Sequence, residues 1–222
     1  MIISRPSPNF DTRGHPVSMV VLHYTGMKTA TEALDRLTDT AAKVSAHWLV
    51  AEDGQIVQLV DETNRAWHAG KAYWRGLTDV NSASIGIEIV NPGHEFGYRP
   101  FPDFQMDSVA HLVAAALKRF AIHPSNVVGH SDVAPARKDD PGELFDWPRL
   151  AAAGLATPIP TGGIDPNWTD HGFLAALARY GYDITEPKAT VTAFQRRFRP
   201  RNIDGNIDAE TRTILYGLSV ST

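Results

Sequence analysis

Five residues of this chain could together perform metal-assisted hydrolysis. His23 lies inside the apolar run MVVLHY, and His130 ends the run VVGH and opens the polar loop SDVAPARKDDPG. Lys138 and Asp140 lie two residues apart in that loop, so their side chains point the same way if the segment is extended. Glu88 lies in the middle of the apolar run IGIEIV. A carboxylate at a buried strand position requires an explanation, because burying a charge is costly.

These residue types predict a catalytic zinc site. Two histidines at strand ends can meet at one edge of a sheet, and Asp140 can complete a set of three ligands. Three protein ligands that leave a fourth position for water are typical of catalytic zinc, which lowers the pKa of the bound water to about 7. Glu88 is then the candidate base. Asp139 is an alternative carboxylate ligand, and His23 alone could equally be an ordinary core residue.

Composition excludes several classes of function. The 222 residues include no cysteine, which removes zinc sites and nucleophiles built on sulfur. Lys plus Arg is 21 and Asp plus Glu is 25, giving a net charge of −4 without a long run of one sign. We therefore expect no nucleic-acid partner. No stretch approaches the roughly 18 apolar residues of a membrane span, so we expect no such span.

The start of the chain bears on location. An export signal has a basic region followed by a long apolar run. The first residues, MIISRPSPNF, lack this pattern. This predicts a cytoplasmic protein. The alternative is a periplasmic protein whose signal was removed before this numbering begins.

The order of elements predicts an α/β fold with a mixed central sheet flanked by helices. Apolar runs at 19–24, 85–90 and 127–130 predict strands, and 47–51 with 55–60 predict a hairpin around Asp53 and Gly54. A capping pattern at Thr29 is followed by apolar residues at helical spacing, which predicts a helix there. Apolar residues at helical spacing from about Asp103 predict a second helix.

A change of composition predicts two domains. Residues 155–168, LATPIPTGGIDPNW, are rich in Pro and Gly and predict a linker between a domain at 1–154 and a small three-helix domain at 169–222. A unit of that size has a marginal core of its own, so we expect it to pack on the larger domain. It supplies none of the candidate ligands, and we expect its removal to leave the metal site intact.

Three motifs, LHYT, GIEIVNPG and GHSDVAPARKDDPG, resemble those of the type 2 zinc-dependent N-acetylmuramoyl-L-alanine amidases. Peptidoglycan recognition proteins share the fold of that family, and the resemblance covers about residues 15 to 150. It implies that His23, His130 and Asp140 bind Zn²⁺ and that Glu88 and Lys138 are catalytic. The implied reaction is hydrolysis of the amide between N-acetylmuramic acid and L-alanine of the stem peptide.

Further motifs suggest where the substrate binds. AWHAG, with Trp67 and His68, resembles a family segment that lines the substrate groove, whereas His47 is either a wall of that groove or a core residue. The segments VTAFQRRF and IDGNIDAETRTILY are similar to a helical peptidoglycan-binding module. The implied partners are peptidoglycan fragments or intact peptidoglycan, and we expect a monomer.

The predicted function is amide hydrolysis of 1,6-anhydromuropeptides in peptidoglycan recycling. The alternatives are an exported amidase that remodels the intact wall, a non-catalytic peptidoglycan recognition protein, and a zinc hydrolase of another amide. A recognition protein would be expected to lack a ligand or Glu88, and neither is missing here.

Overall fold

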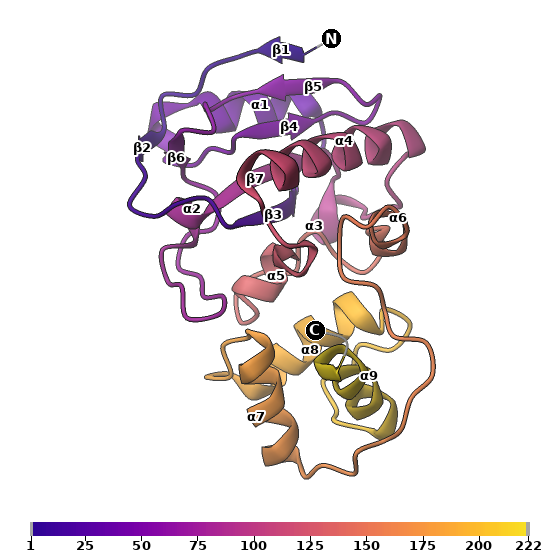
Figure 1. The fold of residues 1–222 in the computed structure, drawn as a ribbon. Coiled ribbons are helices and arrows are strands. Elements are labelled where there is room, and N and C mark those ends of the chain that lie inside the picture. The colour runs from indigo at the N-terminus through magenta and orange to yellow at the C-terminus, as the bar shows by residue number, and fades with distance from the viewer. Residues whose placement is uncertain (1, 221–222) are drawn as a thin grey trace.

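A six-stranded mixed sheet is the centre of the computed structural model, which describes residues 2–220 (Figure 1). The strand order is β1-β5-β4-β7-β3-β8, and every neighbouring pair is parallel except β4 with β5. The strands are β1 (Ile2–Ser4), β3 (Met19–Tyr24), β4 (Trp48–Val50), β5 (Ile56–Gln58), β7 (Ser84–Ile89) and β8 (Val127–Gly129). The predicted α/β class with a mixed sheet is confirmed. Met1, Ser221 and Thr222, at the ends of the predicted domains, lie outside the described residues.

Most predicted elements of the sheet occur near their expected positions. The hairpin at 47–60 is β4 paired antiparallel with β5, and the helix after the capping pattern is α1 (Ala30–Thr38), where Thr29 Oγ1 accepts the N–H of Glu32. Three short strands were not predicted, namely β1 and the separate antiparallel pair β2 (Phe10–Thr12) and β6 (Asn64–Ala66). All residues of β1 and β2 are exposed, so these strands lack the buried apolar pattern that marks a strand in sequence.

The two faces of the sheet bury different helices. On one face, β3 and β7 place alternate residues such as Leu22 and Ile87 against α4 (Asp103–Phe120). On the other face, Leu49 of β4 packs with Leu37 of α1. The short helices are η1 (Thr40–Ala42), α2 (Val80–Ala83), α3 (Gly93–Phe96), η2 (Pro124–Asn126), α5 (His130–Val133) and α6 (Trp147–Ala152). None of the helices within residues 2–220 has the length and apolar character needed to cross a membrane.

The three predicted C-terminal helices are present as α7 (Asp170–Tyr180), α8 (Pro187–Phe198) and α9 (Ala209–Val220). We call these helices and their connecting loops the C-terminal module. Residues 155–168, which lead to it, form neither helix nor strand. Figure 1 shows the module gathered beneath the sheet, beyond α5.

The module and the sheet share one hydrophobic core. A single cluster of buried residues contains Met19 and Val21 of β3, Val128 of β8, Phe194 of α8 and Leu215 of α9. The buried cluster on the face of β3 opposite α4 therefore continues past α5 into the module. The division into independent domains remains a prediction, and the shared core predicts that the two parts unfold together.

We expect Phe194→Ala to destabilise the whole chain. Removing this fully buried ring leaves a cavity in the shared core and should lower the free energy of unfolding by about 3–5 kcal/mol. Calorimetry should show one transition at a lower temperature. As a control, Phe104→Ala removes a ring that is 74% exposed and should change stability by no more than about 0.5 kcal/mol. Two transitions, with only one displaced by Phe194→Ala, would show that the parts fold separately.

Candidate metal centre

Three neighbouring strands bring the predicted residues to one end of the sheet. His23 of β3 and Glu88 of β7 are register partners on adjacent parallel strands, so their side chains project from the same face. Gly129 of β8 is the register partner of Leu22, which places His130 directly beside the end of β3. The local fold thus converts two separate strand ends into one cluster.

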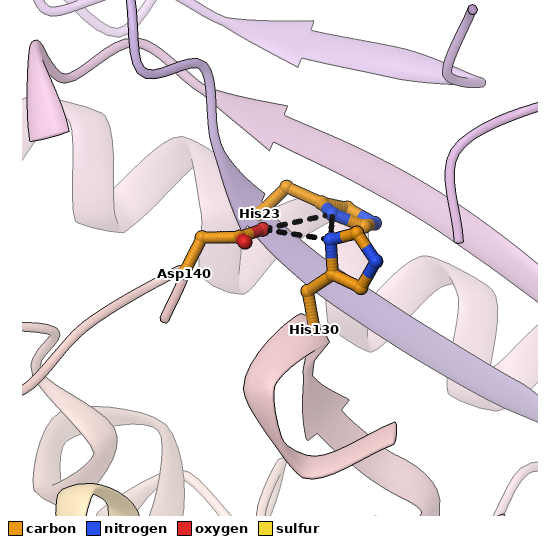
Figure 2. A group of neighbouring side chains, drawn as sticks. All are labelled: His23, His130 and Asp140. Atoms are coloured by element: carbon orange, nitrogen blue, oxygen red, sulfur yellow. Dashed lines mark hydrogen bonds and ion pairs between the residues drawn. The ribbon is translucent and has the colours of Figure 1, made fainter. Parts of the chain in front are cut away.

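Three donor atoms lie close together in this cluster (Figure 2). His23 Nδ1 is 2.9 Å from His130 Nδ1 and 3.0 Å from Asp140 Oδ2, and His130 Nδ1 is 3.1 Å from the same oxygen. All three side chains are buried. Nitrogen and oxygen ligands at about 2.0–2.2 Å around a tetrahedral ion are separated by roughly 3.3 Å. The triangle therefore has the donor types and the approximate size of a metal site.

The electrostatics of the cluster favour a cation. Burial, and then the neighbouring His130, lowers the pKa of His23 to about 4, so its imidazole is neutral at pH 7 and offers a lone pair. Burial alone would raise the pKa of Asp140, but the charge and hydrogen bonds of His130 and His23 outweigh it and hold that pKa below its ordinary value. The negative carboxylate of Asp140 and the neutral imidazole of His23 thus face a common point.

Outer hydrogen bonds fix the two histidine rings. His130 Nε2 donates to the carbonyl oxygen of Ala69 at 3.1 Å, and His23 Nε2 lies 3.0 Å from His68 Nδ1. With Nδ1 of each ring facing the cluster, the proton belongs on Nε2, so His23 donates to His68. His68 Nε2 in turn lies 3.2 Å from Ser84 Oγ, whose hydroxyl donates to Val80 O. Such outer partners orient metal-binding histidines and select their tautomer.

Gly86 makes room for His68. A Cβ atom built at Gly86 of β7 would overlap the ring of His68, so this ring lies directly on the strand backbone. Burial, and then the neighbouring His23 and His47, lowers the pKa of His68 well below its ordinary value, which keeps the ring neutral. His68 borders the cavity described below and also positions His23, while its contact with substrate stays a prediction.

Glu88 has the properties of a general base. Its Oε2 is buried and has no hydrogen-bond partner among the described residues. Burial, and then the charge of Asp140, raises the pKa of Glu88 well above its usual range, while Lys138 opposes this shift. A carboxylate with a raised pKa and a free oxygen is suited to proton transfer near neutral pH.

A cavity of about 360 Å³ lies in front of the cluster. Trp67, His68, Glu88 and Lys138 line it together with the three donor residues. Asp139, the alternative ligand, also borders the cavity. Its side chain is 58% exposed and pairs with Arg196 at 2.7 Å, whereas Asp140 faces the histidines.

His47 does not reach this cavity. Its side chain is fully buried and is absent from the cavity lining. Gly86 N–H donates to its Nδ1 at 2.9 Å, and its Nε2 lies 3.1 Å from the carbonyl oxygen of Asn64. The ring serves to satisfy backbone groups in the core. Its position does not support the prediction that His47 contacts substrate.

Two supporting residues were missed in the sequence. Asn81 Oδ1 accepts the N–H groups of His68 and Ala69 at 3.0 and 2.7 Å, and Arg137 donates to the carbonyl oxygens of Ala69 and Lys71. Both hold the segment that carries His68. Arg137 lies inside a motif that was noted, but Asn81 precedes a strand with no pattern to mark it.

A buried His, His, Asp cluster with a free carboxylate beside it is the arrangement of a metal-dependent hydrolase. The protein-family model for N-acetylmuramoyl-L-alanine amidases matches residues 13–143 of this chain. The chain therefore belongs to this amidase family. It is therefore an amidase, and the predicted family is confirmed.

Individual relatives agree with this assignment. The chain is 35% identical to the N-acetylmuramoyl-L-alanine amidase AmiD of Escherichia coli, over 98% of this chain and 90% of that protein. A solved complex of AmiD with anhydro-N-acetylmuramic acid-L-Ala-D-gamma-Glu-L-Lys superposes with a TM-score of 0.83 at 34% identity, covering 95% of this chain and 92% of the other. AmpDH3 of Pseudomonas aeruginosa, in complex with an anhydromuramic pentapeptide, gives a TM-score of 0.76 at 32% identity over 94% and 93% of the chains.

We expect His68→Ala to weaken metal binding. Without its acceptor, the Nε2 proton of His23 loses its partner, and loss of such a contact typically costs about 10–100-fold in metal affinity or activity. Zinc affinity can be measured by competition with a chelator. Trp67→Ala is the matched control, because Trp67 lines the same cavity and its indole N–H donates to Asp11, and it should change KM while zinc affinity stays constant. Unchanged zinc affinity in His68→Ala, with only KM raised, would assign His68 to substrate contact alone.

His47 should make stability depend on pH. Burial, and then the charge of Arg13, lowers the pKa of His47 to about 3 in the folded state, whereas the unfolded chain takes up this proton near pH 6.5. The unfolded state therefore binds more protons, and stability falls as pH drops from 6.5 towards 3. His47→Asn should reduce the slope of unfolding free energy against pH by about 1.4 kcal/mol per unit in this window. Denaturant titrations at several pH values measure it, and equal slopes would show that His47 does not contribute.

Proposed function

We propose that His23, His130 and Asp140 bind one zinc ion, and that this amidase hydrolyses the amide between 1,6-anhydro-N-acetylmuramic acid and L-alanine in soluble muropeptides. The observation that carries the proposal is the cluster of three buried donor atoms, which all lie within 4.8 Å of one another at the floor of a cavity. The donor set leaves space for a further ligand on the cavity side, as catalytic zinc requires.

The roles of the protein residues follow from their positions. Zinc, when bound, would lower the pKa of a water molecule and polarise the scissile carbonyl. Glu88 accepts a proton from the attacking water on its free Oε2 and returns it to the leaving amine. Lys138 places a positive charge in the same cavity, where it offsets the negative charge that develops on the carbonyl oxygen.

The proposed substrate is supported by two related structures. AmiD and AmpDH3 were each solved with an anhydromuramic peptide, and each covers more than nine-tenths of this chain. All proposed ligands and Glu88 come from one copy of the chain, so the reaction requires no second subunit, and we propose that a monomer acts. The cytoplasmic location stays a prediction, which fractionation of native cells tests.

Wall remodelling is the second candidate function. The similarity to AmiD extends over 98% of this chain and so includes the C-terminal module, whose helices resemble a peptidoglycan-binding module. An enzyme that uses the module to hold the wall would prefer polymeric peptidoglycan. The two candidates therefore differ in relative rates on soluble and polymeric substrates.

Mass spectrometry of digested anhydromuropeptides tests the reaction. The wild-type protein should contain one zinc ion per chain and release the stem peptide. Glu88→Gln should keep its zinc while kcat falls by about 10²–10⁴-fold, because the donor residues are untouched. His130→Ala should lose zinc and activity together. Full activity of His130→Ala would refute the metal site, and tight binding without hydrolysis by the wild-type protein would indicate a recognition protein.

Comparison of substrates tests the role. We expect kcat/KM for soluble anhydromuropeptides to be at least equal to the rate per cleavable bond in purified sacculi. A strong preference for sacculi would favour wall remodelling.

A further inference from the structure

The segment 130–140, which we call the metal loop, contains two of the three proposed ligands, one at each end. The N–H of Ser131 donates to the carbonyl oxygen of Asp140 at 2.9 Å, so backbone ties the two ends together. Further contacts at each end come from the C-terminal module, although the module contributes no ligand.

The first end is fixed through Asp132. This carboxylate is almost fully buried, and its Oδ2 accepts the N–H of Gly129, the residue directly before His130, at 2.7 Å. Tyr182, between α7 and α8, donates its hydroxyl to Oδ1 at 2.6 Å, and Arg197 of α8 pairs with Oδ2 at 3.1 Å. Both oxygens are therefore occupied, and two of the three partners belong to the module.

Arg197 also holds the strand that leads to His130. Its Nη2 donates to the carbonyl oxygen of Val127 in β8 at 2.9 Å, and its guanidinium lies 3.7 Å from the centre of the Trp147 ring. The side chain is only 5% exposed. One buried guanidinium thus fixes both the strand before His130 and the carboxylate after it.

The second end is fixed through Asp139. Arg196 of α8 pairs with Asp139 at 2.7 Å and lies 3.8 Å from Glu143. Asp139 and Asp140 are adjacent carboxylates, and only Asp140 joins the histidines. Arg196 holds Asp139 towards α8, which leaves Asp140 to face the metal position.

From these contacts we infer that the C-terminal module is a positioning element of the metal site, acting through Arg197 on Asp132 and through Arg196 on Asp139. The inference rests on the proposed zinc site. It replaces our expectation that removing the module leaves the site intact. Charge-assisted hydrogen bonds to a buried carboxylate are strong and directional, so their loss lets the metal loop relax away from the geometry that zinc requires.

Zinc affinity of full-length variants tests this inference without recourse to activity. Arg197→Met should weaken zinc binding by about 10-fold or more in chelator competition, in the range typical for loss of an outer contact. Arg199→Met is the matched control. Arg199 is also a buried arginine at the end of α8, but its partners Asp204 and Asp208 both lie within the module. It should lower the unfolding temperature while zinc affinity stays within about twofold of wild type, since distant sites act independently.

The control separates positioning from general destabilisation. Zinc affinity within twofold of wild type in Arg197→Met, or an equal loss in Arg199→Met, would overturn the inference. Failure of the wild-type protein to bind zinc would instead refute the proposed function.

A second set of variants decides the question if Arg197→Met does not fold. Arg196 and Asp139 form a more exposed pair, so Arg196→Met and Asp139→Asn should both fold. Each variant should weaken zinc binding by at least about twofold. The zinc affinity of the double variant should be no lower than that of the single variants, because the two residues act through one contact. Additive effects, or no effect, would overturn the inference.

Discussion

The burial of Asp140 beside two histidine nitrogens is the constraint on which the site depends. Three donor atoms lie within 3.1 Å of one another, and all three side chains are excluded from water. A proton on His23 could compensate the carboxylate, but burial and His130 lower the pKa of His23 to about 4. A bound cation satisfies all three groups at once, since metal coordination is one of the few ways to stabilise a buried charge. The register of β3 with β7, the ring of His68 on Gly86 and the contacts of the metal loop all serve to hold this arrangement.

The metal position and the base are electrostatically linked. Burial, and then the charge of Asp140, raises the pKa of Glu88, and Lys138 opposes this shift. A divalent cation between the donors would oppose the effect of Asp140, because a bound ion is the largest local charge in such a site. A bound ion would therefore lower the pKa of Glu88 and favour its ionised form, which is the form that accepts a proton from water. In this account, filling the site would make Glu88 a more competent base.

Much of this site could be predicted from the sequence, because its residues stand at recognisable positions in the periodic patterns of strands and loops. His23 and Glu88 interrupt apolar strands, and the spacing of Lys138 and Asp140 puts both in a short loop after His130. The choice between Asp139 and Asp140 depends on Arg196, which no local pattern connects to either. For His47, the sequence allowed a groove wall or a core residue, and only the backbone groups of Gly86 and Asn64 distinguish them. The small size of the C-terminal unit predicted that it packs on the larger domain, but a Pro- and Gly-rich connection could not show that Phe194 and the residues of β3 belong to one core.

The central claim, that His23, His130 and Asp140 bind a catalytic zinc ion, is most directly tested by a crystal structure of the zinc-loaded protein with anomalous diffraction measured on both sides of the zinc absorption edge. The account predicts one strong zinc peak bounded by His23 Nδ1, His130 Nδ1 and a carboxylate oxygen of Asp140, with a non-protein ligand on the cavity side. A zinc peak held by Asp139 or by residues elsewhere in the chain, or no peak at this position in crystals grown with excess zinc, would contradict it.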